Sequence, residues 1–131
     1  MAVRLPVRRP FERVKMNVAC QSSRGGARPK LIVLHSTEGS NLAGITDLQG
    51  LGFYFNRPQT QASSHVGVDA EGNCAKYVPD SAKAWTCASF NPVSLNVEQI
   101  GFASQAWPEA QLRKTAQYIA FWSKEYGIPI R

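Results

Sequence analysis

Hydrophobic residues fall into short segments whose spacing predicts strands alternating with helices. The run KLIVLH at 30–35 is continuous and apolar, which is typical of a strand buried on both faces. From 42 to 55 the apolar residues recur at helical spacing, although three glycines weaken the later part of that pattern. SHVGVD at 64–69 alternates and CAKYVP at 74–79 follows a short turn, so these two segments predict a hairpin.

The C-terminal third predicts one more strand and a long helix. SLNVEQIGF at 94–102 is the strand, Pro108 and Glu109 open the helix, and Gly127 with Pro129 ends it. The order strand, helix, hairpin, strand, helix predicts an α/β domain with a mixed central β-sheet flanked by helices.

Charge is concentrated at the N-terminus. The net charge is +6, of which residues 1–30 carry +7 and the remainder −1. We therefore expect a basic, partly flexible N-terminal arm at 1–27 and a domain at 28–131. Such an arm is suited to nucleic acid, an anionic cell wall or an acidic membrane surface, or it is a solvated tail. No helix-turn-helix or zinc-finger motif accompanies the charge, so we expect no specific nucleic-acid partner.

Other features narrow the class of protein. No stretch approaches the roughly 18 uninterrupted apolar residues of a membrane span, and no apolar segment of a signal peptide follows the basic N-terminus. Three cysteines (Cys20, Cys74 and Cys87) without CxxC spacing argue against a disulfide framework and a cysteine-built zinc site. We expect free thiols, with a Cys74–Cys87 bridge as the alternative.

Two residues are candidates for chemistry. His35 ends the first apolar strand, where α/β sheets place ligands, and imidazole is a common zinc ligand; a hydrogen-bonded structural histidine is the alternative. Glu98 lies mid-strand, where a carboxylate is costly to bury unless it is paired or used, so it is a candidate general base. A water-facing glutamate on an edge strand is its alternative. His65 is a candidate for a structural or substrate-contacting role, and Trp85 for a sugar- or peptide-binding groove or for core packing.

Taken together, these segments resemble the type 2 N-acetylmuramoyl-L-alanine amidases, a family that includes peptidoglycan recognition proteins and several phage lysins. LIVLHSTEG resembles the family's first strand and SSHVGVDAEGN its hairpin. KYVPDSAKAW with FNPVSLNVEQIG resembles the stretch that ends in the family's S-I-G-I-E strand, and WPEAQLRKTAQYIAFWSKEYGIPI its long helix. The similarity extends from about Leu31 to Ile130.

The resemblance implies a peptidoglycan hydrolase that lyses bacterial cell walls. It implies zinc as cofactor, His35 as metal ligand and Glu98 as catalytic residue. Substrate contacts are expected at Ser64, His65, Trp85, Thr86 and Asn91. Such a protein would be made in the cytoplasm of a host cell and act on the wall by a delivery route that the sequence does not indicate.

Two departures from the family pattern qualify this expectation. The family commonly has a histidine where this chain has Thr86, which alters the substrate contact expected there. The second zinc histidine and the Asp or Cys that completes the family's site would follow the last helix, and this sequence ends at Arg131. The alternatives are a fragment, a degenerate form, or a site completed by a C-terminal segment or another chain. A non-catalytic peptidoglycan-binding module is the alternative function.

Overall fold

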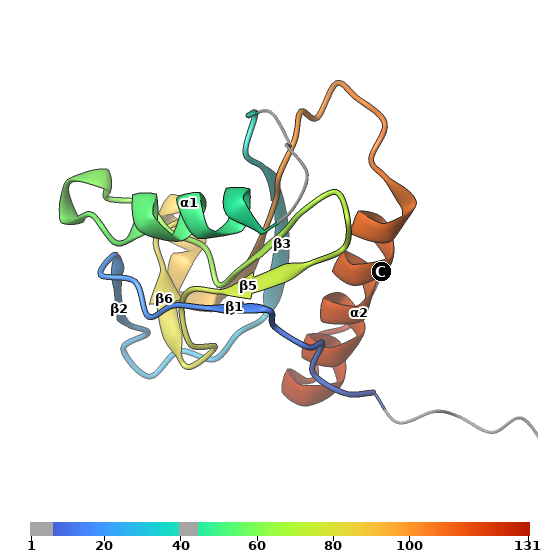
Figure 1. Ribbon diagram of the computed structural model, residues 1–131. Coiled ribbons are helices and arrows are strands. Elements are labelled where there is room, and N and C mark those ends of the chain that lie inside the picture. The colour runs from blue at the N-terminus through green and yellow to red at the C-terminus, as the bar shows by residue number, and fades with distance from the viewer. Residues whose placement is uncertain (1–6, 40–44) are drawn as a thin grey trace, which may run out of the picture.

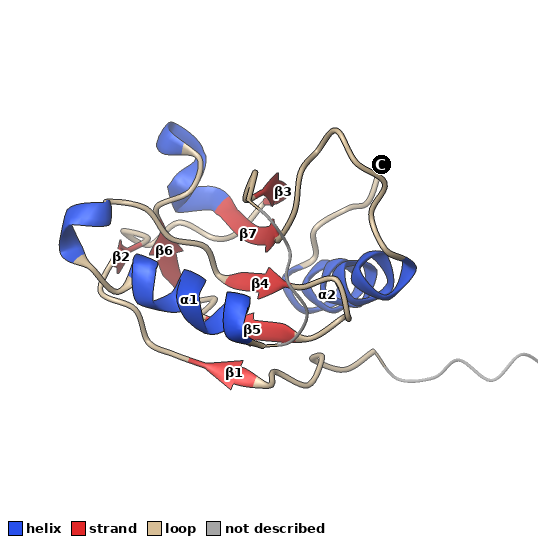
Figure 2. Cartoon of the chain, turned by 45° about the horizontal axis from the view of Figure 1, so that its top comes forward, coloured by secondary structure: helices blue, strands red, loops and turns tan. Residues whose placement is uncertain are grey.

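The computed structural model describes residues 7–39 and 45–131. Its main element is a five-stranded sheet in the order β1-β5-β4-β7-β3 (Figures 1 and 2). The bounds are Val14–Lys15 for β1, Leu31–Ser36 for β3, Val66–Val68 for β4, Cys74–Lys76 for β5 and Ser94–Gln99 for β7. β4 and β5 pair antiparallel, whereas the other three pairings are parallel. The expected mixed sheet is confirmed.

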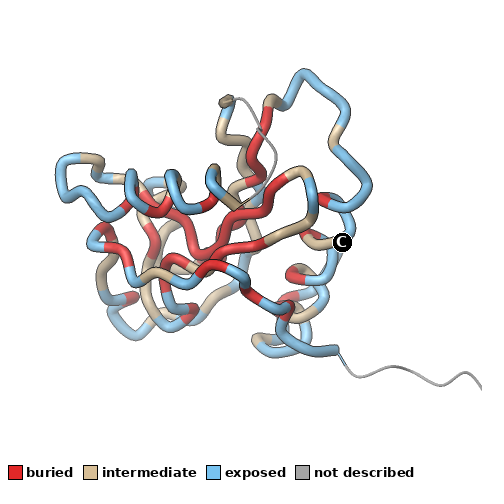
Figure 3. The backbone as a smooth tube through the Cα atoms, in the orientation of Figure 1, coloured by how far each residue is buried: buried red, intermediate tan, exposed pale blue. Residues whose placement is uncertain are grey.

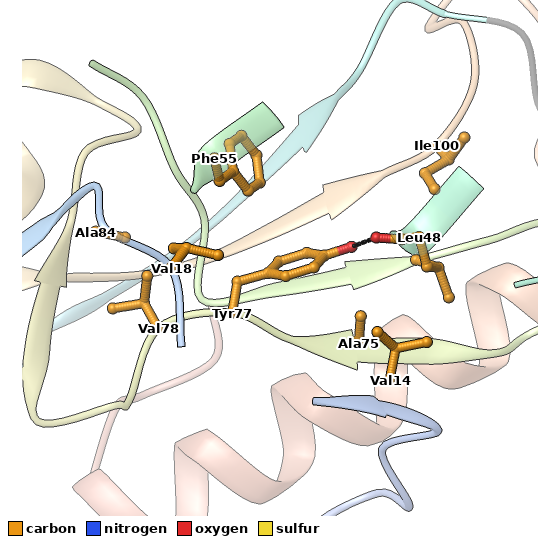
Figure 4. Packing of buried hydrophobic residues seen from close by; sticks show 9 residues of the cluster. All are labelled: Val14, Val18, Leu48, Phe55, Ala75, Tyr77, Val78, Ala84 and Ile100. Atoms are coloured by element: carbon orange, nitrogen blue, oxygen red, sulfur yellow. Dashed lines mark hydrogen bonds between the residues drawn. The ribbon is translucent and has the colours of Figure 1, made fainter. Parts of the chain in front are cut away.

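Two helices cover opposite faces of this sheet. Helix α1 spans Thr46–Phe55, and helix α2 spans Glu109–Tyr126 and ends at Gly127 in the left-handed conformation. On the α2 side, Tyr118 and Trp122 pack on the buried valines and leucine of β4 and β7. On the α1 side, Leu48 and Phe55 pack around Tyr77, whose hydroxyl donates to the Leu48 carbonyl at 2.7 Å (Figure 4). Figure 3 shows that buried residues gather on the inner strands of the sheet, β4, β5 and β7.

The expected elements are confirmed, most of them with shorter bounds, and the structure contains further short elements. The helix expected at 42–55 begins at Thr46, with residues 42–44 outside the described part of the chain. The segments expected to be irregular contain the short 3-10 helices Pro58–Thr60 and Ala88–Val93 and the strand β6, Ala82–Ala84. All three cysteines are free thiols.

The first strand is not buried on both faces as its composition predicts. β3 pairs with β7 on one side only, and in the described residues it is the last strand of the sheet. Leu31 and Leu34 are therefore exposed. An apolar run identifies a strand, but it does not distinguish an edge strand from a central one.

The segment expected to be a flexible arm contributes to the fold over residues 14–24. It supplies β1 and strand β2 (Gln21–Ser23), which pairs antiparallel with β6. Val14, Val18 and Cys20 are buried, as is Arg24. Part of the basic charge is thus used inside the molecule. The Arg24 guanidinium donates to the carbonyl oxygens of Asp80, Pro92 and Ser94 at 2.9–3.0 Å.

Candidate functional site

His35 and Glu98 come together at one end of the sheet. β3 and β7 run parallel in a register that pairs His35 with Glu98, so both side chains leave the carboxyl ends of neighbouring strands on the same face. Open α/β sheets bind ligands at this end. The pairing confirms that the two candidate residues are neighbours, which their separation of more than sixty residues in sequence does not show.

Glu98 has the environment of a functional carboxylate. β7 lies between β3 and β4, so the alternative of an edge-strand glutamate is wrong. Its Oε2 atom is buried and has no hydrogen-bond partner among the described residues. Burial raises the pKa of Glu98 to about 7. Glu98 is therefore a carboxylate that has lost part of its hydration, and no described residue forms an ion pair with it.

Asn96 lies two residues before Glu98 on the same face and contacts the histidine directly. Its Oδ1 atom is 3.0 Å from His35 Nε2. Cys87 Sγ lies 3.5 Å from the same oxygen. Sequence reasoning missed Asn96, although the alternation of Ser94, Asn96 and Glu98 within an apolar strand was a signal for a polar face.

Two of the predicted substrate-binding residues are internal. Ser64 and His65 are both completely buried. The Ser64 hydroxyl donates to the Asn96 carbonyl at 2.9 Å, and His65 Nδ1 accepts the Asn96 backbone N–H at 3.1 Å. Neither side chain has surface to offer a substrate, so their assignment as substrate contacts is corrected to a structural role.

His65 is held neutral by its surroundings. Burial is the main cause that lowers its pKa to about 3, and the nearby cations Lys76 and Arg24 act in the same direction. Its Nε2 atom lies 3.0 Å from the Ala82 carbonyl, which can only accept. Arg24 Nη2 lies 3.1 Å from the same nitrogen, so the Ala82 contact alone does not set its role. Because Nδ1 accepts the Asn96 backbone N–H, the single proton of the neutral ring is on Nε2, which donates to the Ala82 carbonyl.

The other three predicted substrate residues lie in the segment between β6 and β7, and each is held by hydrogen bonds within the protein. Trp85 Nε1 donates to Ser22 Oγ at 2.9 Å, and Thr86 Oγ1 donates to the Ser63 carbonyl. Asn91 Oδ1 accepts the backbone N–H groups of Thr86 and Cys87 at 3.0 and 2.7 Å. All three residues are partly exposed, so their contacts with substrate stay predictions.

The described residues at this site provide only some of the ligands that a metal ion needs. Among residues 7–39 and 45–131, no group of three or more His, Cys, Asp or Glu side chains is arranged to hold one. The imidazole of His35 is a donor of the type that zinc prefers, beside an unpartnered carboxylate oxygen. His35 therefore fits as one ligand of a zinc site.

Comparisons with known proteins agree with this architecture. The family model described as N-acetylmuramoyl-L-alanine amidase matches residues 25–131. A search of curated protein sequences found no match.

Several solved structures share the fold. A selenomethionine AmpD derivative has a TM-score of 0.75 at 18% identity, covering 95% of this chain and 81% of that one. The endolysin amidase LysCS from Clostridium intestinale has a TM-score of 0.70 at 16% identity, covering 94% and 80%. Drosophila peptidoglycan recognition protein SA has a TM-score of 0.67 at 15% identity, covering 78% and 63%. With a family model matched over most of its length, this chain belongs to the N-acetylmuramoyl-L-alanine amidase family.

Proposed function

We propose that this protein is a zinc-dependent peptidoglycan hydrolase that cleaves the amide between the muramic lactyl group and L-alanine. The observation that carries the proposal is the pairing of His35 with Glu98, whose buried Oε2 atom has no partner among the described residues. The family match supports amide hydrolysis in peptidoglycan.

Each of the two residues has a distinct part in this reaction. His35 would hold zinc, which when bound polarises a carbonyl and lowers the pKa of water. Glu98 accepts a proton from the attacking water and passes it to the departing amine. Its partly buried position keeps competing solvent away from the carboxylate. Because no described residue bonds to the Oε2 atom, this oxygen is available for the water.

One imidazole is too few for a tight zinc site, because structural and catalytic sites use three or four protein ligands. We therefore include in the proposal a further segment or a second chain that supplies the remaining ligands. This part of the proposal is motivated by the lack of a three-ligand cluster in the described residues.

The test is cleavage of purified peptidoglycan with identification of the products. We expect zinc-dependent release of stem peptides with a free L-alanine amino group. Glu98→Gln should lower the rate by about 10²–10⁴-fold, since it removes a general base. His35→Ala should abolish zinc-dependent cleavage, whereas Glu125→Gln, an exposed glutamate on α2, should leave it unchanged. Near-normal cleavage by Glu98→Gln or His35→Ala would remove that residue from the mechanism.

A non-catalytic peptidoglycan-binding module is the second candidate. It is favoured by the same lack of three metal-ligating side chains in the described residues. Sedimentation with insoluble peptidoglycan in the presence of a chelator separates the two functions. Binding without zinc and without released peptides would support the module, and zinc-dependent release would support the hydrolase.

The route to the wall is part of the proposal as well. No helix among the described residues is long and apolar enough to cross a membrane. We propose that the protein is made in the cytoplasm of a host cell, as a phage lysin is, and reaches the wall by a separate export or lysis step. Fractionation of expressing cells tests this, because accumulation in the periplasm or medium without such a step would contradict it.

A further inference from the structure

A hydrogen-bonded chain of three side chains runs from the interior of the sheet to His35. Asn96 is completely buried, and its side-chain amide lies between His65 and His35. Its Nδ2 atom is 3.5 Å from His65 Nδ1 and 3.0 Å from Ser94 Oγ, while its Oδ1 atom is 3.0 Å from His35 Nε2. The direction of each hydrogen bond in this chain follows from the one before it.

The backbone sets the first direction. The Asn96 backbone N–H, which can only donate, lies 3.1 Å from His65 Nδ1. His65 Nδ1 therefore carries a lone pair, and the ring proton is on Nε2 beside the Ala82 carbonyl.

The second direction follows from this lone pair. An amide oxygen facing His65 Nδ1 would place two lone pairs against each other in a buried site, so the amide NH₂ faces His65 and the oxygen faces outward. On that side it meets His35 Nε2 and, at 3.5 Å, Cys87 Sγ. Because the oxygen can only accept, His35 Nε2 carries the ring proton, and the lone pair of the neutral imidazole lies on Nδ1.

We propose that Asn96 is a positioning residue that sets the tautomer of His35, so that Nδ1 is the nitrogen that binds the metal. His65 acts one step further away by orienting the Asn96 amide. Metal-ligating histidines characteristically donate their second ring N–H to an acceptor, and Asn96 Oδ1 is that acceptor here. The inference rests on the proposed function for the metal role of His35. Its rival is a metal bound at Nε2 together with the Cys87 thiol, which would have to displace the Asn96 contact.

Nitrogen-15 NMR of the histidine rings tests the proposal on the wild-type protein. Before metal is added, we expect His35 to be protonated on Nε2; a ring protonated on Nδ1 overturns the proposal. On addition of zinc alone, we expect the His35 Nδ1 resonance to shift. A shift at Nε2 overturns the inference but leaves zinc binding intact. If zinc, added together with the segment or chain that supplies the remaining ligands, changes neither nitrogen, the metal role of His35 in the proposed function fails, and with it the zinc part of this inference.

Matched variants separate positioning from packing. Asn96→Leu keeps the approximate size but removes the acceptor, and it should weaken zinc affinity by about 10–100-fold and mix the two tautomers. Asn96→Asp keeps an acceptor for His35 Nε2 and should retain the wild-type tautomer of His35. Its second oxygen then faces the lone pair of His65 Nδ1, so this variant should lose stability while it keeps the tautomer. Cys87→Ala removes the other contact of Asn96 Oδ1, and it should change neither the tautomer of His35 nor the zinc affinity. A loss of affinity in Cys87→Ala as large as that in Asn96→Leu would overturn the proposal in favour of the thiol site.

Discussion

At the scale of single residues, burial decides which polar side chains face substrate and which serve the interior. His65 and Glu98 both resembled functional residues in sequence, yet the first is completely enclosed and the second keeps a buried oxygen without a partner among the described residues. The difference is that β7 donates a backbone N–H to His65, whereas the Oε2 atom of Glu98 accepts no hydrogen bond from a described residue.

The buried neutral state of His65 predicts a pH-dependent stability. Its pKa is about 3 in the folded protein, against roughly 6.5 in the unfolded chain. Between these two values the unfolded chain binds a proton at His65 that the folded protein does not bind, so acid favours unfolding. The contribution of His65 to stability is therefore complete above about pH 6.5 and is lost as pH falls toward 3. Through His65 alone, the free energy of unfolding should fall by at most about 1.4 kcal/mol per pH unit in that window. The raised pKa of Glu98 acts in the opposite direction between about pH 7 and 4.5, so the effect of His65 is measured as the difference between two proteins that both keep Glu98.

Urea unfolding between pH 7 and 4 measures this effect. His65→Gln should be less stable than wild type at pH 7, and the difference in the free energy of unfolding between the two proteins should shrink as pH falls. Equal slopes for the two proteins would show that His65 does not control the acid sensitivity.

At the scale of elements, the site depends on how closely α1 and the neighbouring Tyr77 approach the sheet. Gly67 of β4 lies next to Glu98 in register, and a β-carbon there would be 3.0 Å from the Tyr77 ring and 3.3 Å from Leu48. A side chain at this position would push the α1 layer away from β4. The absence of a side chain thus lets Tyr77 and α1 pack directly on the strand beside the site.

Two alanine substitutions test this close packing. Gly67→Ala should lower the free energy of unfolding by about 1–3 kcal/mol, since the overpacked core has to shift. Gly50→Ala in α1 is the matched control, because its β-carbon would meet nothing within 4 Å, and it should raise stability by about 0.5–1 kcal/mol. Chemical denaturation of both variants measures these changes. An unchanged free energy of unfolding for Gly67→Ala would show that Tyr77 and Leu48 do not pack tightly against β4.

At the scale of the whole molecule, the N-terminal segment joins parts of the chain that lie far apart in sequence. Arg24 bonds to carbonyl oxygens before and within β7, and Arg9 pairs with Asp80 at 2.8 Å. Asp80 also accepts from Trp122 of α2 at 3.1 Å. Although burial opposes ionisation, Lys76 and Arg9 hold the pKa of Asp80 at about 2. The basic residues of this segment are therefore partly structural.

Removal of the Arg24 side chain should destabilise the whole domain. Arg24→Ala would leave the buried carbonyl groups of Asp80 and Ser94 and the partly buried one of Pro92 without this donor. The cost is about 1–3 kcal/mol for each buried unsatisfied group before relaxation. Arg28→Ala, at an exposed position of the same segment, should change stability by less than about 0.5 kcal/mol. Thermal unfolding of both variants and the wild type measures these effects. Equal melting temperatures for Arg24→Ala and Arg28→Ala would contradict a structural role for Arg24.

The sequence predicted much of the fold and the two main site residues, but less of their surroundings. The strands at His35 and Glu98, the hairpin and the long helix have local signals: apolar runs, alternation, and Pro and Gly at helix ends. β1, β2 and β6 have two or three residues each, too few for a periodic pattern, and they exist because partner strands complete them. The burial of Arg24 could not be predicted, because nothing in the sequence distinguishes an arginine that is buried from one that faces water.

By itself, the sequence determined the class of fold, the candidates His35 and Glu98, and the resemblance to the amidases, because each depends on short segments and their order. Only the tertiary structure decided that His35 lies on an edge strand opposite Glu98, that Ser64 and His65 are internal, and that Asn96 joins the two histidines. Those facts depend on strand register and burial, which arise from contacts between residues far apart in the chain.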